Sequence, residues 1–131
     1  MRIILTTLFL FFLILTIYLT SKPGRILFVV PTFPLALQVG AMFFKHVEGN
    51  LWILAEELNY TFGNNPKIIV GTPSELCRNI EKLQIEEIQS LVIDEIHEMN
   101  NNKFMEILIH ACMNQKTPTQ FLGLSATIGN A

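Results

Sequence analysis

The stretch Leu91-Val92-Ile93-Asp94-Glu95-Ile96-His97 is an apolar run that ends in two acids and a histidine. An apolar run of this length, without polar alternation, predicts a strand that is buried on both faces. In open α/β folds, ligands bind outside the carboxyl ends of such strands. The sequence therefore predicts that Asp94 and Glu95 lie at a ligand-binding edge of a sheet.

Three further apolar runs also stop at short polar elements. They end at Pro31-Thr32, at Gly71-Thr72-Pro73 and at Ser125-Ala126-Thr127. Because the carboxyl ends of parallel strands share one edge of a sheet, these elements are expected to lie near Asp94. The sequence thus predicts that four such segments lie at one edge.

Helical segments are expected between the strands. Residues 34–47 show apolar side chains at helical spacing, and a second helix is predicted to start at Asn100-Asn101-Asn102 and to run to about Asn114. Thr72 is a predicted N-cap, with Pro73 in the first helical position and Glu75 completing a capping box. Residues 51–55 fit a strand or part of a helix, and we favour the strand. Alternating strands and helices predict a parallel, doubly wound sheet.

The order and spacing of the four elements resemble the first RecA-like lobe of superfamily 2 helicases over roughly residues 25–131. Motifs Ia, Ib, II and III of that lobe are matched by Pro31-Thr32 with Leu35-Ala36-Leu37-Gln38, by Gly71-Thr72-Pro73, by Asp94-Glu95-Ile96-His97 and by Ser125-Ala126-Thr127. The last two motifs are most similar to the DExH branch that contains exosome-cofactor RNA helicases. The resemblance implies an α/β P-loop NTPase fold, in which helices flank a parallel sheet.

The same resemblance implies ATP and Mg²⁺ as cofactors and RNA or another nucleic acid as a partner. Asp94 would hold Mg²⁺ through water, and Glu95 would position or deprotonate the attacking water. His97 would couple the nucleotide site to Ser125-Ala126-Thr127 and to a second RecA-like lobe. The nucleic-acid contacts implied by the family are Pro31, Thr32, Gly71, Thr72 and Pro73.

The chain departs from the family in two places. No Gly-x-x-x-x-Gly-Lys-Ser/Thr phosphate loop occurs in the 131 residues, so we expect the chain alone to be inactive. Phe33 stands where motif Ia usually has a basic residue, and it either packs in the core or stacks on a base. The expected domain organisation is a hydrophobic segment at residues 1–21 followed by a partial helicase lobe at residues 22–131.

Residues 3–21 contain no charged side chain. A helix of about 19 residues spans about 28 Å, roughly the thickness of the hydrocarbon layer of a bilayer. If this segment is a single-pass anchor, Lys22 and Arg25 favour a cytoplasmic location for the C-terminal side. The alternative is an artefactual start that was never selected as an anchor, and both interpretations remain open.

The bulk composition limits the function. A net charge of −2 lacks the basic surplus of a strong nucleic-acid binder. Cys77 and Cys112 suggest buried, reduced thiols, and His46 and His110 lack partners at metal-ligand spacing. Three hypotheses follow: a piece of an ATP-dependent RNA helicase, a membrane-anchored interaction module derived from a helicase lobe, or a nonfunctional remnant.

Overall fold

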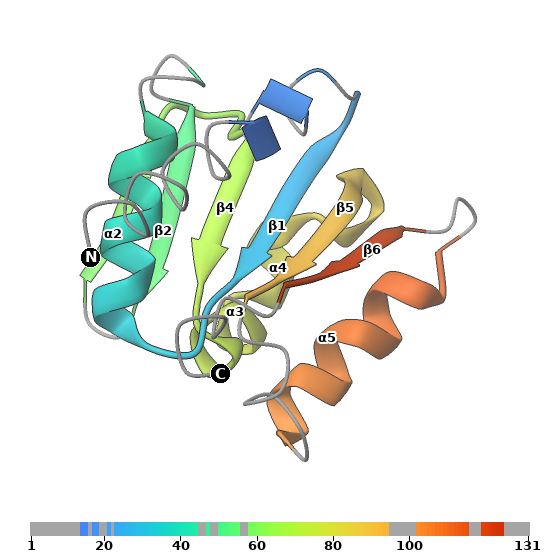
Figure 1. Cartoon of the computed structure of the whole chain (residues 1–131). Coiled ribbons are helices and arrows are strands. Elements are labelled where there is room, and N and C mark those ends of the chain that lie inside the picture. The colour runs from blue at the N-terminus through green and yellow to red at the C-terminus, as the bar shows by residue number, and fades with distance from the viewer. Residues whose placement is uncertain are drawn as a thin grey trace, which may run out of the picture.

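The apolar runs of the sequence assemble into one sheet (Figure 1). In a computed structural model of the chain, the described residues are 14–15, 17–18, 21, 23–44, 47, 50–55, 58–94, 102–115 and 119–124. Within them, six strands lie in the order β3-β2-β4-β1-β5-β6. Their bounds are β1 Arg25–Val29, β2 Leu51–Ala55, β3 Leu58–Phe62, β4 Ile68–Gly71, β5 Ile88–Ile93 and β6 Gln120–Gly123.

Strand β1 lies at the centre of the sheet and pairs in parallel with β4 on one side and β5 on the other. All five residues of β1 are buried, as are all four of β4. Such burial on both faces explains why Ile26–Val29 and Ile68–Val70 are apolar without alternation. The parallel α/β sheet predicted from the sequence is confirmed for β2, β4, β1, β5 and β6.

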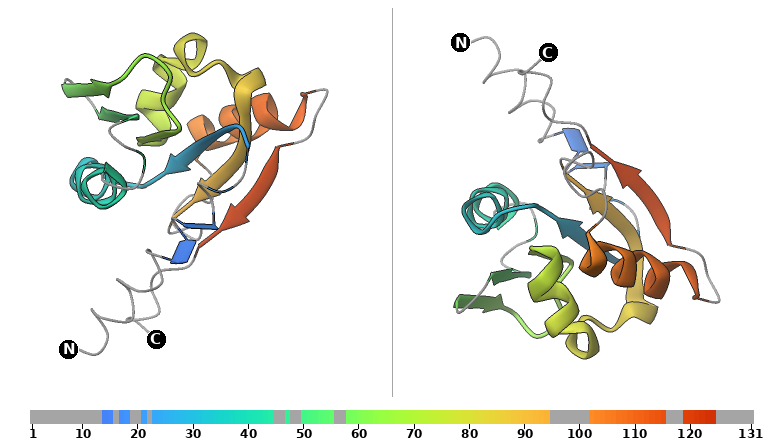
Figure 2. Two further views of the ribbon diagram at one scale, coloured as in Figure 1. Left: turned by 90° about the horizontal axis from the view of Figure 1, so that it is seen from above. Right: turned by 90° about the horizontal axis from the view of Figure 1, so that it is seen from below.

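Helices cover both faces of the sheet (Figure 2). Helix α2 (Phe33–Phe44) packs on the face that carries Ile26 and Phe28 of β1. The opposite face, with Leu27 and Val29, packs against residues of α3, α4 and α5. These helices span Pro73–Arg78, Ile80–Leu83 and Lys103–Met113, with the short 3-10 helix η1 at Ile85–Glu87. The two faces of β1 therefore belong to two separate apolar clusters.

The hairpin of β2 and β3 was not fully predicted. The strand interpretation of residues 51–55 is confirmed, but β3 follows it as an antiparallel strand at the edge of the sheet. Gly63, with φ of +81°, follows β3, and its carbonyl accepts a hydrogen bond of 3.0 Å from Trp52 Nε1. The sheet is thus mixed, with one antiparallel pair beside a parallel body.

Arg25 is a buried residue at the amino end of β1, where its hydrogen bonds reach the turn before β4 and the end of α4. Its Nε donates to the Pro66 carbonyl at 3.0 Å, and its guanidinium nitrogens donate to the Leu83 carbonyl at 3.0 Å and to Asn65 Oδ1 at 2.8 Å. Burial lowers the pKa of this guanidinium, and Glu87 and Glu86 oppose that effect. Since carbonyl oxygens surround the cation, its desolvation is compensated by hydrogen bonds.

The hydrophobic N-terminal segment is described only in part. Residues 14–15, 17–18 and 21 are helical, and Leu15 is buried in the cluster on the α2 face of the sheet. Ile14, Ile17 and Tyr18 are exposed. Among the described residues, no helix has the length and apolar character needed to cross a bilayer. The rest of residues 1–21 lies outside the described residues.

Candidate functional site at the carboxyl edge of the sheet

The carboxyl ends of four strands lie side by side in the order β4, β1, β5, β6. Backbone hydrogen bonds continue the pairing one residue beyond the strands. Val30 N–H donates to the Gly71 carbonyl at 3.0 Å, Asp94 N–H to the Val29 carbonyl at 2.8 Å, and Leu124 N–H to the Ile93 carbonyl at 2.7 Å. The ends of the four predicted motif strands are therefore fixed relative to one another.

Asp94 is the first residue after β5, and it is only 3% exposed. Its backbone is held against β1 at the centre of the edge. A carboxylate in this position supplies the hard oxygen ligand that Mg²⁺ prefers, so the residue type fits the predicted ion. Glu95 and His97 were predicted beside it, and both lie outside the described residues.

Pro31 and Thr32 lie at the end of β1. Thr32 is exposed, and its carbonyl accepts the Ala36 N–H at 3.1 Å where α2 begins. Phe33 is half-buried and packs against the α2-side core, which favours the packing interpretation of this residue. Gln38 is exposed on α2, so it contributes to the polar side of the helix and not to the core.

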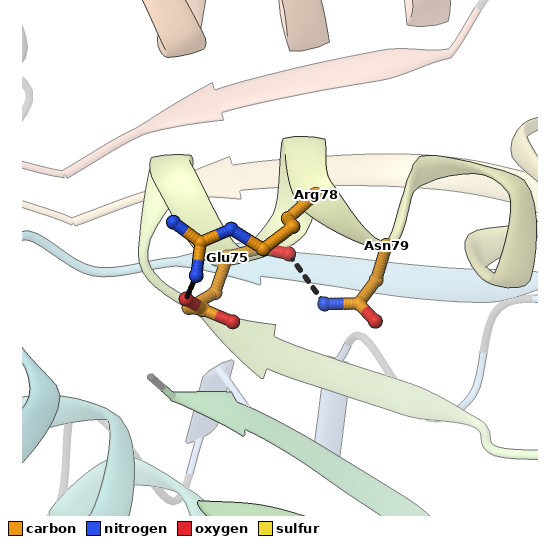
Figure 3. Close-up of polar contacts among 3 residues, drawn as sticks. All are labelled: Glu75, Arg78 and Asn79. Atoms are coloured by element: carbon orange, nitrogen blue, oxygen red, sulfur yellow. Dashed lines mark hydrogen bonds and ion pairs between the residues drawn. The ribbon is translucent and has the colours of Figure 1, made fainter. Parts of the chain in front are cut away.

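Thr72 and Pro73 begin α3 after β4, as predicted. Thr72 has extended backbone angles, φ −82° and ψ 156°, and its carbonyl accepts the Leu76 N–H at 3.0 Å. The capping-box prediction is wrong in its side-chain part, because Thr72 makes no side-chain cap hydrogen bond. Glu75 is turned toward Arg78, whose guanidinium donates to Glu75 Oε1 at 2.7 Å (Figure 3).

The Glu75–Arg78 pair is a feature that the sequence interpretation missed. Glu75 is 3% exposed, whereas the Arg78 side chain is 72% exposed. Asn79 adds a hydrogen bond of 2.7 Å from its amide nitrogen to the Glu75 carbonyl (Figure 3). The available signal was the spacing of opposite charges three residues apart on a helix.

Gly71 has a packing explanation that is independent of any ligand. A Cβ atom at this position would lie 2.7 Å from the Leu54 carbonyl oxygen and 2.8 Å from Leu76 Cδ2. Gly71, Thr72 and Pro73 are all buried, so the exposed member of the predicted nucleic-acid contacts is Thr32, beside the half-buried Pro31. Ser125, Ala126 and Thr127 follow β6 in the sequence and lie outside the described residues.

The cysteines and His110 are possible metal ligands or reactive groups by residue type, but their surroundings favour structural roles. Cys77 and Cys112 are free, and burial raises the pKa of both thiols, that of Cys112 to about 11. His110 is exposed on α5, where its Nε2 lies 2.8 Å from the Asn114 amide nitrogen. In the part of the chain that the structure describes, no three His, Cys, Asp or Glu side chains form a group that could hold a metal ion.

Solved helicases share this fold. The helicase domain of Pyrococcus furiosus Hef superimposes with a TM-score of 0.66 at 21% identity, over 87% of this chain and 26% of that one. S. cerevisiae Dbp5, solved with RNA and ADP BeF3, gives 0.63 at 19% identity, over 82% and 29%. The UvsW helicase of bacteriophage T4 gives 0.59 at 19% identity, over 90% and 43%.

The chain thus spans less than half the length of each of these structures. A search of curated proteins found no significant match. The family model described as DEAD/DEAH box helicase matches residues 6–131, which is nearly the whole sequence. With four motif strands adjacent at one edge, the chain belongs to the DEAD/DEAH box helicase family.

Proposed function

We propose that this chain forms part of the first RecA-like lobe of an ATP-dependent RNA helicase of the DExH branch. The observation that carries the proposal is the position of Asp94, which is buried at the centre of the carboxyl edge between the ends of β1 and β6. An acid at this edge is suited to hold Mg²⁺, which in turn binds nucleotide phosphates. RNA as substrate is supported by the Dbp5 complex, in which the relative is bound to RNA.

In this proposal, the residues at neighbouring strand ends of the carboxyl edge have different roles. Asp94 holds Mg²⁺ through water, and Glu95 orients the attacking water. His97, Ser125 and Thr127 carry the state of the nucleotide site toward a second RecA-like lobe, because hydroxyl and imidazole groups both donate and accept hydrogen bonds. Mg²⁺, when bound, neutralises the phosphate charge that develops during transfer.

Thr32 is the proposed nucleic-acid contact with the best access, because it is exposed at the end of β1. A hydroxyl and the backbone N–H groups beside it can bind phosphate without reading sequence. The usual basic residue is replaced by Phe33, which packs against the core. We therefore expect weak RNA binding by the isolated chain, in agreement with its net charge of −2.

The proposal is tested in a longer polypeptide, in which residues 22–131 are joined to a phosphate loop and a second RecA-like lobe. We expect RNA-stimulated ATP hydrolysis. Glu95→Gln should lower the rate of ATP hydrolysis by about 100-fold or more and leave ATP binding intact, because it deletes only the group that orients water. Asp94→Asn should weaken binding of Mg²⁺ and ATP as well.

Glu81→Gln is the matched control, since Glu81 is an exposed acid on α4. ATP binding is measured separately with a fluorescent nucleotide. The assignment fails if the joined polypeptide binds no nucleotide, or if Glu95→Gln and Asp94→Asn hydrolyse ATP at the rate of the Glu81→Gln control.

A membrane-anchored, non-catalytic interaction module is a second candidate function, with its C-terminal side in the cytoplasm. The uncharged residues 3–21 and the exposed apolar side chains of Ile14, Ile17 and Tyr18 favour it. Membrane fractionation of the full chain distinguishes the two. Pelleting that resists alkali supports an anchor, whereas extraction by alkali contradicts it.

A further inference from the structure

Strand β3 presents an unusual edge. Among the described strands it has a neighbour only on the β2 side, and its residues 59–62 are all exposed. Its sequence, Leu58-Asn59-Tyr60-Thr61-Phe62, contains no charge and no proline, and its pairing with β2 is in continuous register. Edges of natural sheets are normally protected by lysine, proline or a bulge. The unprotected backbone of β3 is therefore complementary to another strand.

An apolar groove lies beside this edge on the α2 face of the sheet. It has a volume of about 390 Å³ and runs between Leu37, Ala41 and Phe44 of α2 and Tyr60 and Phe62 of β3. The Phe44 and Phe62 rings meet edge to face with centroids 5.0 Å apart, and the Tyr60 and Phe62 rings stack at 6.5 Å. No charged side chain lines the groove. A charged partner is disfavoured there because its charge would lose water without gaining a counter-charge.

We propose that two copies of this chain associate edge to edge through β3, in antiparallel pairing. A two-fold axis perpendicular to the sheet relates such strands. The aromatic faces of the two copies therefore lie on the same side of the joined sheet. With the axis at Tyr60, this side chain opposes Tyr60 of the second copy, and in the backbone register position 62 opposes position 58 of the second copy.

The opposite face of the strand is also self-complementary in this register. Asn59 opposes Thr61 of the second copy, so two polar side chains that donate and accept hydrogen bonds face each other. An uncharged strand meets an uncharged strand at every position. A second copy therefore offers matching side chains on both faces of β3, aromatic on one face and polar on the other. For this reason we assign the edge of β3 to a second copy.

The test is a charge exchange on the proposed axis, measured on the full chain by sedimentation velocity. The wild-type chain is expected to be a dimer. Tyr60→Lys and Tyr60→Glu should each be monomeric, because they oppose like charges, with dissociation constants raised about tenfold or more. An equimolar mixture of the two variants should dimerise again, because lysine then opposes glutamate.

Phe121→Lys is the matched control. Phe121 lies on β6, the opposite edge strand, and is 38% exposed, compared with 37% for Tyr60. This variant should remain dimeric. Monomeric wild-type chain, dissociation by Phe121→Lys, or no recovery in the mixture overturns the proposal. Circular dichroism of each variant verifies that the fold is retained.

A second measurement does not depend on purification. Cysteines that oppose each other across a two-fold axis in adjacent strands lie within disulfide range, with Cα atoms about 4.5–5.5 Å apart. Tyr60→Cys should form a covalent dimer on a non-reducing gel, and Phe121→Cys should not. Cross-linking through Phe121→Cys in place of Tyr60→Cys would show that the other edge pairs, and would refute the proposal.

Discussion

At the scale of single residues, the start of α3 shows how a buried charge is kept. Glu75 is buried, and its carboxylate is paired with Arg78, whose side chain is largely exposed. A buried carboxylate that loses its partner retains its desolvation cost, whereas removal of both charged groups eliminates it. The main effect of the ion pair is thus to avoid an unpaired buried carboxylate, and the energy of the contact itself is secondary.

Arg78→Met should lower the free energy of unfolding by about 1–2 kcal/mol, a value reduced because Arg78 is largely exposed. The double variant Glu75→Met with Arg78→Met should recover most of that loss. Urea denaturation followed by circular dichroism measures both. Lys82→Met is the control, since it removes an exposed cation of α4 and should stay within about 0.5 kcal/mol of wild type. Equal effects of Arg78→Met and Lys82→Met would contradict the expectation.

Cys112 is a buried residue whose thiol can ionise. Burial raises the pKa of its thiol from the ordinary 9.0 to about 11. Because the pKa of this thiol is higher in the folded than in the unfolded chain, the contribution of Cys112 to the free energy of unfolding should be fully present below pH 9. This contribution should be lost as the pH rises from 9 to 11. Cys112→Ala should show a smaller loss over this pH range. Alkylation with mass spectrometry should find Cys112 unmodified at pH 8 until the chain is unfolded.

At the scale of elements, α2 lies unusually close to β2. A Cβ atom at Gly40 would be 2.3 Å from Ile53 Cδ1 and 2.7 Å from Ile53 Cγ1. The preference of helices for alanine over glycine is worth about 1 kcal/mol. Overpacking of a core costs about 1–3 kcal/mol. The contact with Ile53 therefore decides the sign, and glycine is the stabilising residue at this position.

Gly40→Ala should destabilise the chain by up to about 2 kcal/mol after the gain in helix propensity is included. Ile53→Val removes the Cδ1 atom, so the double variant should be more stable than the sum of the single changes by about 1 kcal/mol. Gly71→Ala is the contrasting variant, since its Cβ meets the backbone oxygen of Leu54 and Ile53→Val should not relieve it. Strict additivity of Gly40→Ala and Ile53→Val would refute the contact argument.

The elements that the sequence predicted well are those whose local and global preferences agree. Strands β1, β4, β5 and β6 contain the apolar runs Ile26–Val29, Ile68–Val70, Leu91–Ile93 and Phe121–Leu122. Helix α5 follows the N-cap Asn102, whose side chain accepts the Met105 N–H at 3.1 Å. Strand β3 was missed because an exposed edge strand mixes polar and aromatic residues, and its stability comes from pairing with β2. The direction of the Glu75 side chain was also not predictable, because Arg78 competes with the cap.

At the scale of the whole molecule, the sheet brings together motif segments that are far apart in the sequence. The adjacency of Thr32, Thr72 and Asp94 follows from the strand order, and the parallel sheet allowed it to be expected. Burial of Gly71, Thr72 and Pro73 was not expected, because their contacts with other elements depend on packing that no local pattern encodes. The relative positions of Thr32, Thr72 and Asp94 were thus predictable, but the accessibility of Thr72 was not.

The 131-residue chain by itself should show no ATP hydrolysis above background. Phosphoryl transfer requires backbone N–H groups and a lysine around the phosphates, and the sequence contains no phosphate loop. A phosphate-release assay with and without RNA measures this. Hydrolysis that disappears with Glu95→Gln would contradict the prediction, and would mean that another segment cradles the phosphates.

The central place of β1 also governs how the chain folds during synthesis. β1 precedes both of its neighbours in the sequence, and its Ile26 and Leu27 pair with Ile68 of β4 and Leu91 of β5. Translation of the roughly 60 intervening residues takes about 3–12 s at about 5–20 residues per second. Strand β4 is completed after about two thirds of this interval, and β1 lacks its β5 neighbour until the end. We therefore expect the apolar residues of β1 to be accessible to ribosome-associated chaperones during synthesis.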